Sequence, residues 1–271
     1  MRFAYRSFFV AMLALLGTTS SVANAQGLIW KLPEKDGVQV RYGGVYTHTT
    51  FDPVTNVQKD KTAWDRTLTI SSVGRESGDS GAARWIEFKV EMRKKDDVGA
   101  ELGPVAVRIY KVLIDEKEEL GRTPTADDPL PVTFIRIKKG YRKLSDADPE
   151  PITSGVLQVF PTVSLLRHFR EFKSGSGTPD DPQLANHPDL KAAKWSGTFS
   201  MESLRSQSVN SADIWSSKDV PFGLARWDVN IVRKSKRATA PRDDFVKVTE
   251  IVLNMEFKEA VEGAKSELPV K

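Results

Sequence analysis

The chain has 271 residues, of which 28% are charged, with a formal net charge of +4 and no cysteine. The lack of cysteine excludes disulfide bonds, thiolate metal sites and cysteine nucleophiles. The near-balanced charge, without a long run of lysine or arginine, argues against nucleic acid as a partner.

Residues 1–25 have the three parts of a secretory signal peptide. A start that carries two arginines is followed by the apolar run Phe8–Leu16 and then by Ala23-Asn24-Ala25. An uncleaved anchor is the alternative, but it would need about 20 apolar residues. We therefore expect cleavage after Ala25 and a periplasmic or secreted mature protein. Loss of both arginines lowers the net charge from +4 to +2.

Alternation of apolar and polar residues with a period of two dominates the mature chain. In segment 84–93 it predicts an apolar strand face of Ile86, Phe88, Val90 and Met92 and a solvated face of Trp85, Glu87, Lys89, Glu91 and Arg93. Similar patterns predict strands at 38–51, 64–73, 105–115, 132–138, 155–160, 195–201, 224–232 and 245–257. Gly43-Gly44 inside the first run predicts a bulge or a sharp bend.

The order of these elements predicts a mainly β fold. Helices do not alternate with the strands, which argues against a parallel βαβ fold. We expect a strongly curved antiparallel sheet, either an unclosed barrel or a sandwich, that forms a single domain over residues 26–271.

One amphipathic helix is predicted from Val163 to Phe172, with Thr162 as its N-cap. Its apolar face would carry Leu165, Leu166, Phe169 and Phe172. We expect it to pack on the sheet, while peripheral contact with a membrane is the alternative. The Gly-, Ser-, Pro- and Asp-rich segment 173–190 that follows predicts a long polar loop.

The sequence offers no recognisable catalytic or metal-binding constellation. The three histidines, His48, His168 and His187, have no carboxylate at metal-ligand spacing. No G-x-S-x-G elbow, P-loop or dinucleotide fingerprint is present. We therefore predict no catalytic residue, metal or cofactor and a protein that is not an enzyme, with a hydrolase as the least favoured alternative.

Aromatic and apolar side chains are the remaining candidates for a function. The six tryptophans either line the concave side of the sheet and contact a lipid, a glycan or a polypeptide, or are ordinary core residues. The candidate ligand-binding residues are Leu165, Phe169 and Phe172 of the predicted helix and Trp195 and Trp227 of the predicted strands.

The stretch 213–227, DIWSSKDVPFGLARW, predicts a corner between two strands. Pro221 cannot donate a hydrogen bond to a central ladder and belongs at a strand start or an edge. A tryptophan-bearing strand, a polar turn, a proline and a long charged strand resemble the C-terminal part of the bacterial lipoprotein-sorting proteins LolA and LolB. The resemblance covers Trp195 to Phe257 and implies an unclosed antiparallel β-barrel with helices on its concave face. The chain departs from that pattern, with one predicted helix where those carriers have several.

Two functions follow as expectations. The first is an exported binding protein that holds a lipid, a lipoprotein or another apolar partner in the concave face of the sheet. The second is a structural or interaction protein of the cell envelope without a small-molecule ligand. The oligomeric state stays open.

Replacement of Ala23 and Ala25 by bulky residues should block processing, because signal peptidase requires small side chains at these positions. Mass spectrometry of the purified wild-type protein should give the mass of a chain that starts at Gln26. A wild-type protein that starts at Met1 would contradict the predicted export.

Overall fold

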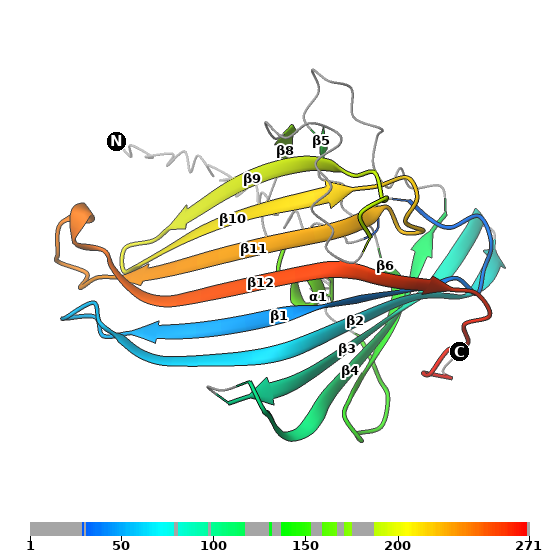
Figure 1. The fold of residues 1–271 in the computed structure, drawn as a ribbon, viewed down its shortest axis with the longest axis horizontal. Helices are drawn as coiled ribbons and strands as arrows, with labels where there is room; N and C mark the ends of the chain where they lie inside the picture. Colours follow the sequence, from blue (N-terminus) through cyan, green and yellow to red (C-terminus); the bar gives the residue numbers. More distant parts are fainter. Residues whose placement is uncertain are drawn as a thin grey trace, which may run out of the picture.

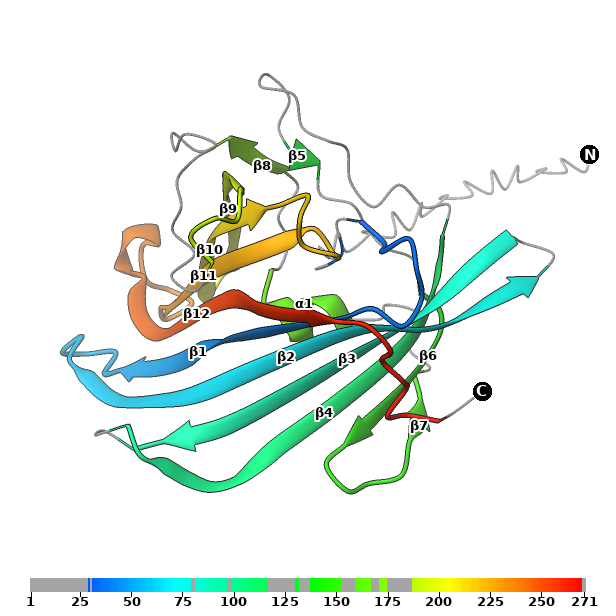
Figure 2. The ribbon, with the colours of Figure 1, turned by 45° about the vertical axis from the view of Figure 1, so that its right-hand side comes forward.

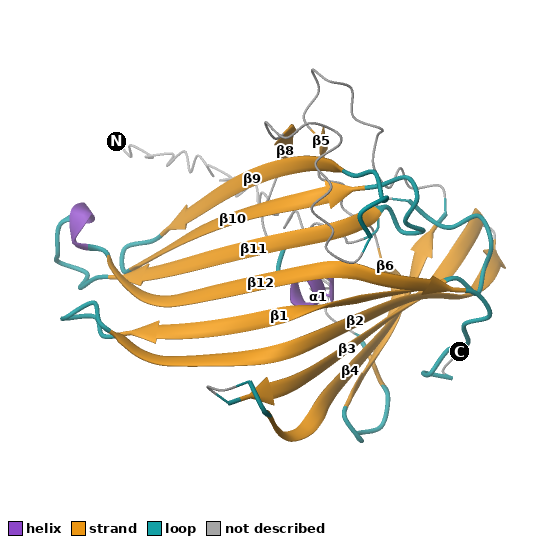
Figure 3. Ribbon diagram, in the orientation of Figure 1, coloured by secondary structure: helices purple, strands orange, loops and turns teal. Residues whose placement is uncertain are grey.

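The computed structural model describes residues 29, 31–78, 81–96, 99–116, 130–131, 137–152, 159–166, 171–174 and 187–269. These residues form one short helix, α1 (Val159–Ser164), a 3₁₀ turn, η1 (Arg242–Asp244), and twelve strands (Figures 1 and 3). The strands are β1 (Gln39–Phe51), β2 (Gln58–Gly78), β3 (Gly81–Lys95), β4 (Glu101–Asp115), β5 (Leu130–Pro131), β6 (Ile137–Leu144), β7 (Glu150–Pro151), β8 (Glu171–Ser174), β9 (Ala193–Glu202), β10 (Ser206–Ser216), β11 (Leu224–Ser235) and β12 (Val246–Val261).

All twelve strands belong to one antiparallel sheet in the order β5-β8-β9-β10-β11-β12-β1-β2-β3-β4-β6-β7. The two-residue strands β5 and β7 end the sheet on its two sides, so it is not closed. Figure 2 shows that the sheet is strongly bent and that α1 lies inside the bend. The prediction of a mainly β protein with a curved, unclosed antiparallel sheet is therefore confirmed.

The concave face carries the main hydrophobic core, as the alternation in the sequence predicts. Ile86 and Phe88 of β3 are fully buried there. The ring of Tyr42 packs edge-to-face on Trp227 at a centroid distance of 5.0 Å, and its hydroxyl donates to the Leu224 carbonyl at 2.8 Å. Burial raises the pKa of Tyr42, so its side chain is neutral.

The predicted extent of the helix is wrong. α1 ends at Ser164, and Leu165 adopts a left-handed backbone with φ of 59° that cannot continue the helix. Leu165 and Leu166 directly follow α1 and Phe172 lies in β8, and all three side chains are buried in one core.

Two predictions for the segments on either side of this helix also need correction. The predicted strand at 155–160 ends inside α1, since Val159 and Phe160 are helical, and residues 155–158 lie outside the described residues. The predicted loop at 173–190 begins with Lys173 and Ser174, which belong to β8. Residues 175–186 of that loop are outside the described residues.

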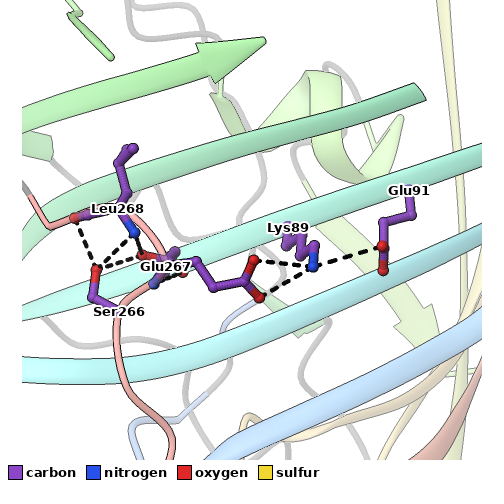
Figure 4. A network of polar contacts seen from close by, with 6 residues as sticks. Lys89, Glu91, Ser266, Glu267 and Leu268 are labelled. Atoms are coloured by element: carbon purple, nitrogen blue, oxygen red, sulfur yellow. Dashed lines mark hydrogen bonds and ion pairs between the residues drawn. The ribbon is translucent and has the colours of Figure 1, made fainter. Parts of the chain in front are cut away.

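The solvated face predicted for β3 is wrong at two positions. Trp85 is 6% exposed and Glu87 is 4% exposed. The segment after β12 crosses this outer face, and Figure 4 shows its contacts. The Glu87 carboxylate accepts hydrogen bonds from the Ser266 hydroxyl at 2.7 Å and from the amides of Glu267 at 3.0 Å and Leu268 at 3.2 Å. Alternation assigned each side chain to the correct face, but it does not report which segment later covers that face.

Glu87→Ala should therefore lower the free energy of unfolding by about 1–3 kcal/mol, because it removes the carboxylate that accepts three hydrogen bonds from the docked segment 266–268. Glu91→Ala is the matched control on the same strand face, where the side chain is 33% exposed and should matter by less than about 0.5 kcal/mol. Urea unfolding measures both changes. Equal losses at the two positions would show that the tail does not dock on Glu87.

Candidate binding site on the concave face

A single row of inward-facing positions crosses the concave face, with one position on each of seven neighbouring strands. Backbone pairing places them side by side in the order Trp195, Ile214, Trp227, Met255, Gly44, Arg66 and Met92. Since side chains alternate along a strand, every member of the row faces the inside of the bend. Arg66 is its one charged member.

The C-terminal end of α1 lies over this row and is hydrogen-bonded to the sheet on both sides. The Trp227 indole N–H donates to the Ser164 carbonyl at 3.2 Å. Nη2 of Arg66 donates to the carbonyls of Val163 at 2.5 Å and Thr162 at 3.3 Å. The last carbonyls of a helix lack partners within the helix, so these donors satisfy them.

Arg66 is a buried cation with an unusual environment. Its side chain leaves the residue 4% exposed, and no described carboxylate forms an ion pair with it. Its Nε has no hydrogen-bond partner among the described residues. Burial lowers the pKa of Arg66 to about 10, so the guanidinium is still charged at neutral pH. A buried charge without a counter-ion is unfavourable for folding.

The next inward row, one step closer to the β1–β2 turn, contains a pair of aromatic residues. Tyr46 and Trp64 are paired across β1 and β2, and their ring centroids are 5.3 Å apart. Both are half-buried. Across β12, β11, β10 and β9 the row continues through Leu253, Val229, Ala212 and Gly197. From Trp64 across β1 to β9 the row is thus apolar, and on the other side of Trp64 it continues to the exposed Lys94 of β3.

The candidate residues of the sequence fall largely into one cluster. Leu165, Phe172, Trp195 and Trp227 all belong to the core of the concave face, and each is at most 9% exposed. The Trp195 indole donates to the Ser216 hydroxyl at 3.1 Å. Phe169 lies outside the described residues. The four described residues pack the floor of the concave face and the end of α1.

Sequence reasoning missed Arg66 and Tyr46, and it considered Trp64 only as one of the six tryptophans that could line the concave face. A signal for Arg66 was present, because in segment 64–70 the alternation places it on the same face as Leu68 and Ile70. A charged residue at an inward position of an otherwise apolar strand face is uncommon. The bond to α1 could not be predicted, since it joins positions almost a hundred residues apart.

Within the described ranges, no group of three or more histidine, aspartate or glutamate residues is placed to hold a metal ion. None of the helices formed by the described residues is long and apolar enough to cross a membrane.

Comparison with known proteins does not identify a family for this chain. No protein-family model and no curated protein matches the chain. DynF from the dynemicin biosynthesis pathway of Micromonospora chersina aligns with 87% of this chain and 86% of its own, at 12% identity and a TM-score of 0.23. The outer membrane protein OprG from Pseudomonas aeruginosa aligns with 86% of this chain and 99% of its own, at 11% identity and a TM-score of 0.15. Similarity at this level carries no argument about fold or function.

Arg66→Met should change the free energy of unfolding by less than about 1 kcal/mol, because the lost hydrogen bonds to α1 are offset by removal of an unpaired buried charge. Phe88→Ala, on the neighbouring strand, is the control for a true core position and should cost about 3–5 kcal/mol. Chemical denaturation of both variants measures the difference. A loss for Arg66→Met as large as that for Phe88→Ala would show that the arginine is a structural necessity.

Proposed function

We propose that the protein is an exported, non-enzymatic binding protein that holds a lipid, a lipoprotein or another apolar partner against the concave face of its sheet. The observation that carries the proposal is the extent of that apolar face. Inward rows of apolar side chains cross seven strands, while the one α-helix packed on them in the described chain has only six residues. The central side chains of these rows are buried in the described structure, so the part of the face left for a partner is its half-buried end at Tyr46 and Trp64.

The half-buried aromatic pair supports the same proposal. Tyr46 and Trp64 face inward beside the buried core, yet both retain contact with solvent. Inward-facing aromatic rings with exposed area are typical of the mouth of an apolar binding surface. The signal peptide predicted at residues 1–25 would deliver the protein to the compartment where envelope lipids and lipoproteins are found.

Trp64→Glu should weaken binding of an apolar fluorescent probe, N-phenyl-1-naphthylamine, by at least about tenfold, because it places a charge on the inward apolar row. Val45→Glu is the matched control: Val45 precedes Tyr46 on β1, faces outward and is 40% exposed, so the same charge should leave binding unchanged. Probe fluorescence is titrated under conditions where thermal melting shows both variants to be folded.

Native mass spectrometry of protein purified from its own cell envelope adds a direct measurement of a retained lipid. Equal loss of binding in both variants would place the probe elsewhere on the molecule. No saturable binding by the folded wild type, together with no retained lipid, would reject the proposal and leave an interaction protein of the envelope as the remaining function.

A further inference from the structure

The charge of Arg66 is not explained by its bonds to α1. On the other half of the sheet Trp227 satisfies a carbonyl of the same helix end with a neutral N–H. A neutral donor in place of Arg66 could therefore satisfy the carbonyls of Thr162 and Val163 without the burial of a cation. The positive charge itself requires another reason.

The guanidinium also has unused hydrogen-bonding capacity. An arginine side chain has five N–H donors in a planar fork that fits a carboxylate or a phosphate. Only Nη2 donates to α1, and the buried Nε has no acceptor among the described residues. An anion placed beside the guanidinium would accept from Nε and would also neutralise the charge.

The surroundings of Arg66 favour an anion over a cation. The ionisable groups that influence it are Tyr46 on β1 and Arg108 and Tyr110 on β4. Arg108 is exposed and carries the same charge as Arg66. Gly44 on β1 and Met92 on β3 are its direct neighbours across the strands, and neither carries a charge. Among the described residues, the one charged group that influences Arg66 is thus another cation.

The arrangement of apolar residues gives the direction of a chain attached to such an anion. Leu68 and Ile70, which follow Arg66 on the inward face of β2, are fully buried in the core. Trp64, which precedes it, is half-buried and pairs with Tyr46. An apolar chain can therefore extend from Arg66 over the two aromatic rings but not into the packed core.

We infer that Arg66 binds the anionic headgroup, a carboxylate or a phosphate, of a single-chain amphiphile whose apolar chain lies over Tyr46 and Trp64. This inference rests on the proposed function and adds a preference for a negatively charged ligand. The bonds from Arg66 to Thr162 and Val163 then hold the guanidinium in the absence of a ligand, and the headgroup takes the donor that α1 leaves unused.

The test compares two fluorescent probes that differ only in charge, 11-(dansylamino)undecanoic acid and its methyl ester, each titrated into folded full-length protein. The wild type should bind the acid at least about tenfold more tightly than the ester, since a buried charge-assisted hydrogen bond contributes strongly to affinity. Arg66→Met should abolish this preference and leave the affinity for the ester within about threefold of wild type. Arg66→Lys should retain part of the preference, because it keeps the charge but not the fork.

A control variant and a competition experiment test whether the headgroup binds at Arg66. Arg41→Met, on the outer face of β1 where the side chain is 53% exposed, is the control for nonspecific charge and should keep the wild-type preference. Competition by dodecanoate and by dodecyl phosphate distinguishes a carboxylate from a phosphate headgroup, and displacement by either supports the inference.

The outcomes separate this inference from the proposed function. Equal affinity of the wild type for acid and ester would overturn the role of Arg66 but leave an apolar binding protein. A preference that survives in Arg66→Met and disappears in Arg108→Met would also overturn it, since the headgroup would then bind Arg108. Failure of both probes to bind would overturn the proposed function and with it this inference.

Discussion

The pairing of β1 with β12 is the contact on which the rest of the sheet depends. It joins the first and the last long strand, so that β2, β3 and β4 extend on one side and β11, β10 and β9 on the other. The approach is close at Gly44, where a Cβ atom would lie 1.8 Å from the Asn254 carbonyl oxygen. Only glycine fits there, and the register shifts between Arg41 and Tyr42 just before it. Through the pairing of β1 with β12, Trp227 from the C-terminal half and Arg66 from the N-terminal half lie in one continuous inward row.

The two halves of the sheet, which meet where β1 pairs with β12, are also joined through α1. Trp227 comes from the C-terminal half and Arg66 from the N-terminal half, and both donate to the last carbonyls of the same six-residue helix. A helix this short is not stable alone, so its position is set by the sheet and not by helix propensity. The helix end therefore depends on both halves of the sheet being in place, and Arg66 is fixed in the interior by the same bonds.

The sequence predicted the faces of the strands well and the elements between them poorly. Alternation through Ile86 and Phe88 identified the core face, and the glycine pair Gly43-Gly44 marked the irregular strand, because both signals are local. The helix was misplaced since Leu165, Leu166 and Phe172 share one core without sharing one helix, a result of tertiary packing. The burial of Glu87 by residues 266–268 and the bond from Arg66 to Val163 are long-range contacts, which a single sequence does not encode in any local pattern.

Charged side chains form ion pairs on the outer face of the sheet, whereas the buried Arg66 on the inner face forms none with the described carboxylates. On the outer face, charges are paired across neighbouring strands, as in Arg41–Glu259 at 3.4 Å, Lys95–Asp65 at 2.8 Å and Lys194–Asp213 at 3.1 Å. Such exposed pairs contribute little to stability and serve mainly to keep the face solvated. On the inner face, the buried guanidinium of Arg66 has no carboxylate beside it among the described residues. A counter-ion would stabilise a buried charge far more than an exposed one. Among the described residues, charges are thus paired at the surface, where an ion pair contributes little, while the buried guanidinium of Arg66 has no carboxylate beside it, and this contrast is the basis of the proposal that a ligand supplies the counter-ion.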